Sequence, residues 1–229
     1  MNRLRDGGHR AVLFDLDGTL VDTAPDMVRI LQALQRDRGV LPVSYDLGRS
    51  NVSNGALGLL RIGFPDADDD LREELRLDYL DRYAAGICEH STIFAGLELL
   101  LLDLDMAEIP WGVVTNKPAF LTNPLLQALQ LAERAACSVS GDTVPLRKPH
   151  PAPLLHACEL AGVDPRESIY IGDASRDIEA GRAAGMGTIA AGYGYITEDD
   201  DPKRWGADLI AGDTEELAKI VRKAVNLDS

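Results

Sequence analysis

Residues 11–19 read AVLFDLDGT, and this stretch decides the fold. Its four apolar residues without alternation are typical of a strand that is covered on both faces, as in a parallel sheet. The strand ends in Asp15 and Asp17, whose charges repel each other unless a cation lies between them. A hard divalent ion suits such a pair, and Gly18 lets the backbone turn closely around a ligand and point its N–H at an anion. For this stretch alone, an ordinary turn stabilised by Asp side chains stays open as the alternative.

The same arrangement of an apolar run followed by polar residues recurs along the chain. Residues 111–114 run into Thr115, and residues 168–171 run into Gly172 and Asp173. Weaker apolar runs lie at 137–140 and 187–191, and stretches with helical spacing lie at 119–131, 151–161 and 175–184. Strands that alternate with helices predict a doubly wound, Rossmann-like α/β core with a parallel sheet. Ligands bind such sheets at the carboxyl ends of the strands, which is where the polar residues stand.

The segment 21–91 differs from the rest of the chain. It is interpreted as helical throughout, with no strand and with helices expected at 26–38, 54–61 and 70–83. Because it follows the first strand directly, we expect a helical cap domain, residues 21–91, inserted into a core domain formed by residues 1–20 and 92–229.

One loop of this segment, at Ser53, Asn54 and Gly55, is rich in hydrogen-bond donors. It is a candidate for contact with a substrate when the cap closes. A polar helix start with Ser53 or Asn54 as the cap residue explains the same loop.

Polar residues at two further strand ends suit phosphate. Thr115 and Asn116 offer a hydroxyl and an amide near a helix start, although helix capping explains either residue alone. Lys148 precedes Pro149, whose stiff backbone favours an inward direction of the lysine side chain. An ammonium group held in this direction would neutralise the charge of a phosphoryl group. An exposed loop lysine is the alternative for Lys148.

Asp173 and Asp177 follow another strand and open a helix. Asp173 is expected to bind a metal directly, and Asp177 to act through water or to orient Lys148. Capping of the helix is the alternative for both acids. Taken together, the polar residues at the strand ends predict one pocket for a metal ion and a phosphate.

The amino-acid composition limits the kinds of molecule that the protein is expected to bind. The chain has 229 residues and a formal net charge of −14, so nucleic acid and anionic membranes are poor partners, whereas a small anion is compatible with a locally cationic pocket. The three cysteines form no C-x-x-C pair, which favours reduced thiols over a disulfide framework or a zinc site. Residues 1–10 are polar, so we expect no signal peptide and a cytoplasmic protein.

The quoted segments resemble the four ordered motifs of the haloacid dehalogenase superfamily. These are DxDGT at residues 15–19, a threonine at Thr115, a Lys-Pro pair at Lys148 and GDxxxD at residues 172–177, and the helical insertion is similar to a C1-type cap. The resemblance implies that Asp15 is the nucleophile and Asp17 the general acid and base.

It also implies that Thr115 and Lys148 bind phosphate, with Gly18 and Asn116 beside them. Asp173 would complete a Mg²⁺ site with Asp15 and the backbone carbonyl of Asp17.

Finer similarities concern the substrate. Residues 114–118, 140–142, 148–151 and 192–195 resemble bacterial phosphoglycolate phosphatases, and residues 111–118, 194–196 and 205–208 also resemble N-acetylmuramic acid 6-phosphate phosphatases. We therefore expect hydrolysis of a small phosphorylated metabolite, with 2-phosphoglycolate first and a sugar phosphate such as N-acetylmuramic acid 6-phosphate next. A sugar phosphomutase and a non-enzymatic phosphoacceptor domain stay open, as does the choice between monomer and homodimer.

Overall fold

A six-stranded parallel sheet forms the centre of the part of the chain that the computed structural model describes, which is Leu4 and residues 8–227. The strands are β1 (Ala11–Phe14), β4 (Trp111–Val114), β5 (Cys137–Val139), β6 (Ser168–Gly172), β7 (Gly187–Ala191) and β8 (Leu209–Ala211). Their order is β5-β4-β1-β6-β7-β8. The chain builds outward on one side of β1 and then on the other, so the topological switch point lies at β1. The predicted doubly wound α/β fold is confirmed.

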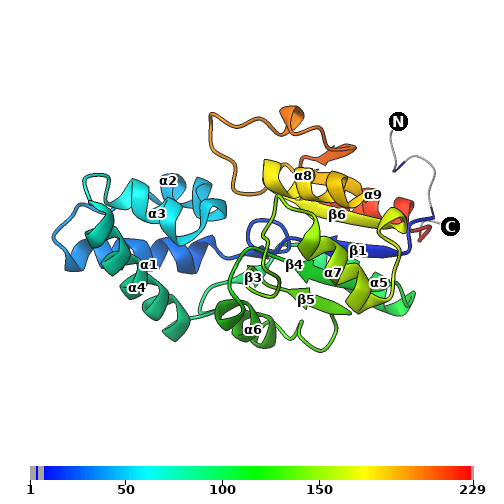
Figure 1. The fold of residues 1–229 in the computed structure, drawn as a ribbon, viewed down its shortest axis with the longest axis horizontal. Coiled ribbons are helices and arrows are strands. Elements are labelled where there is room, and N and C mark those ends of the chain that lie inside the picture. The colour runs from blue at the N-terminus through cyan, green and yellow to red at the C-terminus, as the bar shows by residue number, and fades with distance from the viewer. Residues whose placement is uncertain (1–3, 5–7, 228–229) are drawn as a thin grey trace.

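Helices cover both faces of this sheet, as Figure 1 shows. The helices are α5 (Leu97–Met106), α6 (Ala119–Ala128), α7 (Ala152–Ala161), α8 (Ser175–Ala184) and α9 (Thr214–Ala224). Val12 and Phe14 pack in the apolar cluster that contains α5, α6 and α9, whereas Leu13 packs with α7 and α8. Successive side chains of a strand point to opposite faces, so a strand covered on both faces is apolar at every position.

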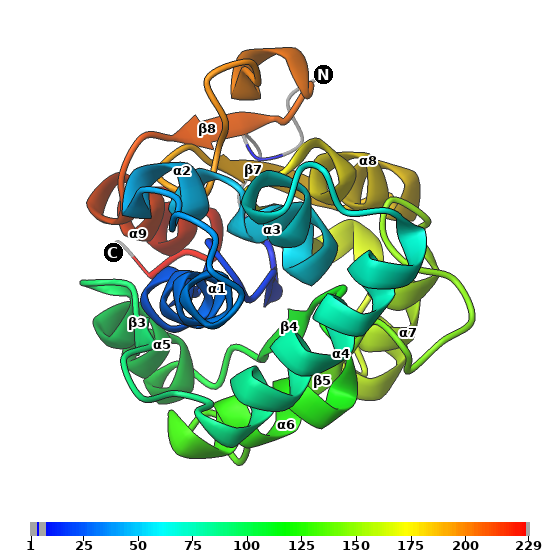
Figure 2. The same ribbon diagram turned by 90° about the vertical axis from the view of Figure 1, so that its left-hand side faces the viewer.

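A second group of helices follows β1 and is here called the helical insert, residues 24–85. It comprises α1 (Ala24–Asp37), α2 (Tyr45–Ser50), a 3₁₀ turn (Val52–Asn54), α3 (Gly55–Gly63) and α4 (Asp69–Ala85). Its helices share their own apolar cluster, which includes Leu31, Leu60 and Tyr79. Figure 2 looks onto the helical insert, which lies at one end of the sheet.

Two short strands connect the helical insert to the sheet. β2 (Val21–Asp22) precedes α1, and β3 (Thr92–Ile93) follows α4; they pair with each other in antiparallel fashion. The interpretation of residues 21–91 as free of strands is therefore wrong at Val21 and Asp22. A two-residue strand carries no periodic pattern of its own, because it forms only when its partner returns from the far end of the helical insert.

The boundaries of several helices also differ from those expected. The helix expected at 119–131 ends at Ala128, since Gln130 adopts a positive φ of 58° that stops the helix. The helices expected at 54–61 and 70–83 run from 55 to 63 and from 69 to 85. No helix of the described residues has both the length and the apolar character needed to cross a bilayer.

Candidate functional site

Lys148 is a fully enclosed charge at the carboxyl end of the sheet. Its Nζ lies 2.9 Å from Oδ1 of Asp15 and 2.7 Å from Oδ1 of Asp177, and its side chain is fully buried. The ammonium also donates to the carbonyl oxygen of Val114 and to the Tyr170 hydroxyl. Lys148 therefore holds the side chains that follow β1 and β6 together, and it is not an exposed loop lysine.

Three carboxylates gather beside Lys148. Oxygens of Asp15, Asp173 and Asp177 lie within 4.8 Å of one another, and all three side chains are buried. Burial, reinforced by the charges of Asp15 and Asp177, raises the pKa of Asp173 to about 7. Burial likewise raises the pKa of Asp177, against the opposing effect of Lys148. Lys148 and the neighbouring Arg176 supply two positive charges for three enclosed acids, so a further cation is needed to stabilise all three in ionised form.

One oxygen of Asp173 is suited to bind a cation. Oδ2 accepts hydrogen bonds from the Ser53 hydroxyl at 2.6 Å and from the Tyr195 backbone at 2.8 Å. Oδ1 is buried and has no hydrogen-bond partner among the described residues. An unsatisfied buried carboxylate oxygen beside two other carboxylates is a set of ligands that suits a hard divalent cation.

The turn after β1 requires glycine. Gly18 has a φ of +82°, and a Cβ atom there would stand 2.1 Å from Oδ2 of Asp173. Only glycine allows the backbone of the DxDGT turn to approach the acidic group so closely.

Asp17 turns away from the three buried acids toward a different cation. Its Oδ1 accepts from Nζ of Lys117 at 2.8 Å and from the Thr23 hydroxyl at 2.7 Å. Nζ of Lys117 also donates to the hydroxyl of Tyr83 in α4, at 3.0 Å. A chain of contacts thus joins Asp17 of the sheet to the helical insert.

The two polar residues after β4 have different surroundings. Thr115 is buried and lines the same cavity as Asp15. The side-chain amide of Asn116 is engaged in both directions with the backbone of Lys148, at 3.0 and 3.1 Å. Asn116 therefore fixes the loop that carries Lys148, and only its backbone is available to an anion.

A cavity of about 440 Å³ opens between the sheet and the helical insert. The side chains that line it include Asp15, Asp17 and Thr115 on the sheet and residues 52–57 of the helical insert. Four cations also line it: Arg76, Lys117, Arg147 and Arg176. The cavity is thus locally cationic in a chain whose net charge is −14, which suits an anionic ligand.

The loop at residues 53–55 reaches the acidic group directly. Ser53 donates its hydroxyl to Asp173, and its carbonyl oxygen accepts from the Arg176 guanidinium at 2.8 Å. Asn54 makes no side-chain capping bond at the start of α3, and Gly55 has a φ of +66°. Ser53 is therefore a contact between the helical insert and the sheet.

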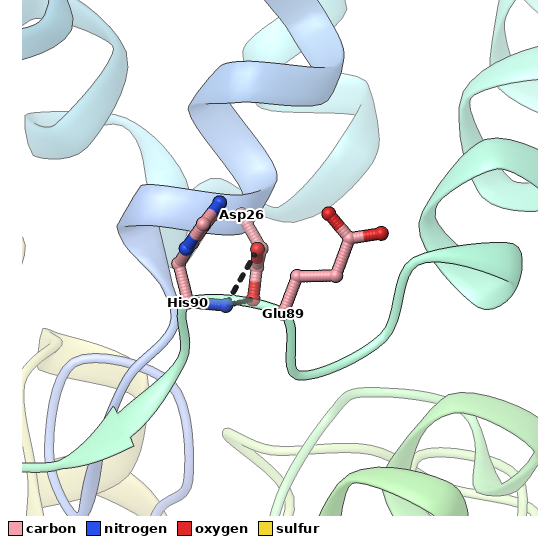
Figure 3. A group of neighbouring side chains, drawn as sticks. All are labelled: Asp26, Glu89 and His90. Atoms are coloured by element: carbon pink, nitrogen blue, oxygen red, sulfur yellow. Dashed lines mark hydrogen bonds between the residues drawn. The ribbon is translucent and has the colours of Figure 1, made fainter.

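A second group of possible metal ligands lies at the base of the helical insert (Figure 3). It contains Asp26, Glu89 and His90. The buried carboxylate of Asp26 accepts backbone N–H groups of His90 and Ser91 and the Ser91 hydroxyl, while Glu89 pairs with Arg29 at 2.6 Å. Because protein donors already occupy the oxygens of Asp26, this group serves as an anchor for the returning chain.

Comparison with known proteins assigns the chain to a family. The family model described as haloacid dehalogenase-like hydrolase matches residues 9–185, which span the three buried acids and Lys148. The chain belongs to this family. Haloacid dehalogenase-like hydrolases are enzymes, so the protein is a hydrolase, as its motifs predict.

The relatives of this chain among the haloacid dehalogenase-like hydrolases are named for two different substrates. An N-acetylmuramic acid 6-phosphate phosphatase of Pseudomonas putida is 44% identical over 94% of this chain and 97% of its own length. A phosphoglycolate phosphatase of Xanthomonas campestris pv. campestris is 43% identical over 91% of this chain and 94% of its own. The crystal structure of a predicted phosphoglycolate phosphatase from Haemophilus somnus has a TM-score of 0.82 at 26% identity and covers 93% of this chain and 98% of that one.

Several residues of the site carry no role in the sequence analysis. Lys117 follows Thr115 and Asn116 directly, so its place after a strand end was a usable signal. Arg176 stands inside the GDxxxD motif, which was a signal of the same kind. No such signal marks Tyr83 and Arg76 in the sequence, because their position in the site depends on how α4 packs over the sheet.

Proposed function

We propose that the protein is a Mg²⁺-dependent phosphomonoester hydrolase that works through an aspartyl-phosphate on Asp15. Residues 21–91 would act as a cap over the core formed by residues 1–20 and 92–229. The observation that carries the proposal is the convergence of Asp173 and Lys148 on Asp15, which lines a cationic cavity.

The first half of the reaction belongs to Asp15 and Asp17. A carboxylate oxygen of Asp15 attacks phosphorus in line, and the bond from phosphorus to the ester oxygen breaks. Asp17 donates a proton to the departing alkoxide, with Lys117 and Thr23 fixing the direction of its carboxyl group. The leaving group then departs as an alcohol, and the phosphoryl group stays on Asp15.

Water completes the reaction. Asp17, now ionised, removes a proton from the attacking water, which displaces the carboxylate of Asp15 and releases inorganic phosphate. Thr115, Lys148 and the backbone N–H group of Asn116 would hold the phosphoryl oxygens. The expected role of the Gly18 N–H in binding an anion is wrong, because this group donates to the carbonyl oxygen of Val21 at 3.0 Å. Bound Mg²⁺, held by Asp15, Asp173 and the carbonyl oxygen of Asp17, would neutralise charge so that two anions can meet.

We propose N-acetylmuramic acid 6-phosphate, the substrate named for two of the relatives, as the preferred substrate of this chain. Support comes from the size and lining of the cavity, because pockets of about 300 to 1,000 Å³ hold ligands larger than a two-carbon acid. Met27, Leu57 and Leu80 give it an apolar wall that suits the ring and methyl groups of a sugar.

The second candidate substrate is 2-phosphoglycolate. Its two anionic groups suit the four cations of the cavity, and relatives at 43% identity are named for it. A wall of apolar side chains has little to bind in such a small and fully polar molecule.

The test is a comparison of purified protein on three substrates with and without Mg²⁺. The substrates are N-acetylmuramic acid 6-phosphate, N-acetylglucosamine 6-phosphate and 2-phosphoglycolate, and the measurement is kcat/KM for phosphate release. We expect activity to require Mg²⁺ and to be highest on the first. Higher kcat/KM on 2-phosphoglycolate would move that substrate to first place, and release from none of the three would refute the proposal.

The assignment of the nucleophile gives the first prediction. Asp15→Asn should lower kcat by more than about 10³-fold, the scale for loss of a covalent nucleophile, while the protein stays folded. The measurement is phosphate release together with trapping of the phosphorylated protein by acid quench. If the Asp15→Asn variant still gave a phosphorylated protein after the acid quench, the phosphoryl group would have to be on another residue.

A further inference from the structure

One face of α4 forms a wall of the cavity. Arg76, Tyr79, Leu80 and Tyr83 all line it, and their spacing of three, four and seven residues places them on a single face of the helix. The two tyrosines are fully buried, so this face is fixed by packing in the helical insert. Its side chains therefore hold constant positions along the cavity.

The two ends of this face stand at different distances from the reacting groups. Tyr83 contacts Lys117, which in turn contacts Asp17, so the Tyr83 end lies beside the proposed acid. Arg76 stands seven residues earlier, which corresponds to about 10 Å along the helix axis. Arg76 thus lies about two helical turns from the end of the cavity where the phosphate is expected.

Arg76 differs from the other cations of the cavity. Lys117 is paired with Asp17, Arg176 is bound to Ser53 beside the buried acids, and Arg147 adjoins Lys148. Among the described cations that line the cavity, Arg76 alone comes from the helical insert.

The guanidinium of Arg76 is held ready for an anion. Its Nε and Nη2 donate to the Glu73 carboxylate at 2.7 and 2.6 Å, and no bond from Nη1 to the described residues is present. The carboxylate of Glu73 is 54% exposed, and such a pair in water is weak. Glu73 therefore orients the fork of Arg76 without neutralising it strongly, and one edge stays available to a ligand.

We propose that Arg76 binds a carboxylate of the substrate at the end of the cavity away from Tyr83 and Asp17, and so selects phosphorylated sugar acids. The inference rests on the proposed phosphatase function and names its specificity residue. The carboxylate of 2-phosphoglycolate lies next to the ester oxygen, too close to the phosphate to reach Arg76. In N-acetylmuramic acid 6-phosphate the lactyl carboxylate is carried on O3 and the phosphate on O6, so several bonds and part of the sugar ring separate the two anionic groups, and the carboxylate can reach a cation farther along α4.

The experiment uses two sugars that differ only in the lactyl group. For full-length protein with Mg²⁺, kcat/KM is measured on N-acetylmuramic acid 6-phosphate and on N-acetylglucosamine 6-phosphate, and the first value is divided by the second. Arg76→Gln should lower this ratio by about 10- to 100-fold, the range for a charge-assisted bidentate contact, mostly through KM. Activity on the second sugar shows that the variant is folded and competent.

The chain supplies matched controls. Arg72→Gln changes an arginine one turn earlier on α4 that bonds Asp69 and Ala67 and does not line the cavity, so the ratio should stay as in the wild type. Arg76→Lys should keep part of the ratio, because an ammonium retains the charge without the fork.

The outcomes separate the two levels of the proposal. A wild-type enzyme that hydrolyses both sugars equally, or an Arg76→Gln variant with an unchanged ratio, overturns the role of Arg76 and leaves the phosphatase function standing. A wild-type protein that hydrolyses neither sugar refutes the proposed substrate class itself. A selective fall in the ratio for Arg76→Gln, absent in Arg72→Gln, supports the proposal.

Discussion

At the scale of single residues, the surroundings of Asp173 have opposite effects on the charge of its carboxylate. Ser53 and the Tyr195 backbone stabilise its charge, but burial and the nearby Asp15 raise its pKa from 3.8 to about 7. Without a cation, the native state therefore binds more protons than the unfolded chain between about pH 4 and pH 7. In that window the contribution of Asp173 to stability falls as pH rises.

This balance predicts how Mg²⁺ stabilises the protein. Because the ion competes with the proton on Asp173, the rise in Tm on adding Mg²⁺ should be larger at pH 8 than at pH 5.5. Thermal denaturation with Mg²⁺ or with a chelator measures it. Asp173→Asn should abolish most of the rise at both pH values, and equal shifts in the wild type at the two pH values would contradict the argument.

Lys117 gives a second prediction at this scale. Lys117→Gln should misdirect the carboxyl group of Asp17 and lower kcat/KM on a sugar phosphate, which reports the step that transfers the phosphoryl group to Asp15, by about 10- to 100-fold, a fraction of the full effect of general acid catalysis. The loss should be much smaller on p-nitrophenyl phosphate, whose leaving group needs no proton. Equal losses on both substrates would mean that Lys117 acts on something other than protonation of the leaving group.

Residues at strand ends were the ones open to prediction. Asp15, Thr115, Lys148 and Asp173 each follow an apolar strand or a stiff loop, and parallel strands bring their carboxyl ends to one edge. Tyr83 and Arg76 look like ordinary residues of an amphipathic helix until α4 is placed over that edge.

At the scale of elements, the connection between sheet and helical insert depends on Asp26. It lies in the first turn of α1 and is fully buried, and it accepts the backbone N–H groups of His90 and Ser91. The two connecting segments are thereby joined beside the β2–β3 pair.

Removal of this carboxylate should loosen the connection. Asp26→Ala leaves buried N–H donors without a partner and should lower the free energy of unfolding by about 2 kcal/mol. Denaturant unfolding measures the loss. Asp26→Asn keeps one acceptor oxygen and should lose less, whereas a wild-type stability for Asp26→Ala would show that water replaces the carboxylate without cost.

Elements with a long pattern were predicted well and short ones were not. The strand at 11–14 and the helix at 175–184 appear at the expected residues, because an unbroken apolar run marks a strand buried on two faces and helical spacing marks the helix. β2 and β3 have two residues each and exist only through their pairing, which no local pattern specifies.

At the scale of the whole molecule, the helical insert is held against the sheet by contacts around the cavity. Besides Ser53 and Lys117, Arg49 of α2 lies 4.9 Å from the centre of the Tyr195 ring and reaches the carbonyl oxygens of Tyr193 and Gly194. A substrate must enter before these contacts close.

Arg49 thus offers a test of closure. Arg49→Gln should favour an open arrangement, with a larger radius of gyration by small-angle X-ray scattering and a higher KM for the sugar phosphate. Arg61→Gln, at an exposed position of α3, should change neither quantity. A radius of gyration unchanged by Arg49→Gln would mean that the other contacts suffice to hold the helical insert closed.

The position of β1 between β4 and β6 has a consequence for biosynthesis. The strand is made before every other strand of the sheet, yet its neighbour β6 begins only at residue 168. At usual rates of translation this apolar strand waits on the order of ten seconds for that partner. The helices of residues 24–85 contact one another and can fold in the meantime, and β4 can pair with one edge of β1 before β6 is made. The edge of β1 that later meets β6 is therefore the part of the nascent sheet that stays open to aggregation for longest.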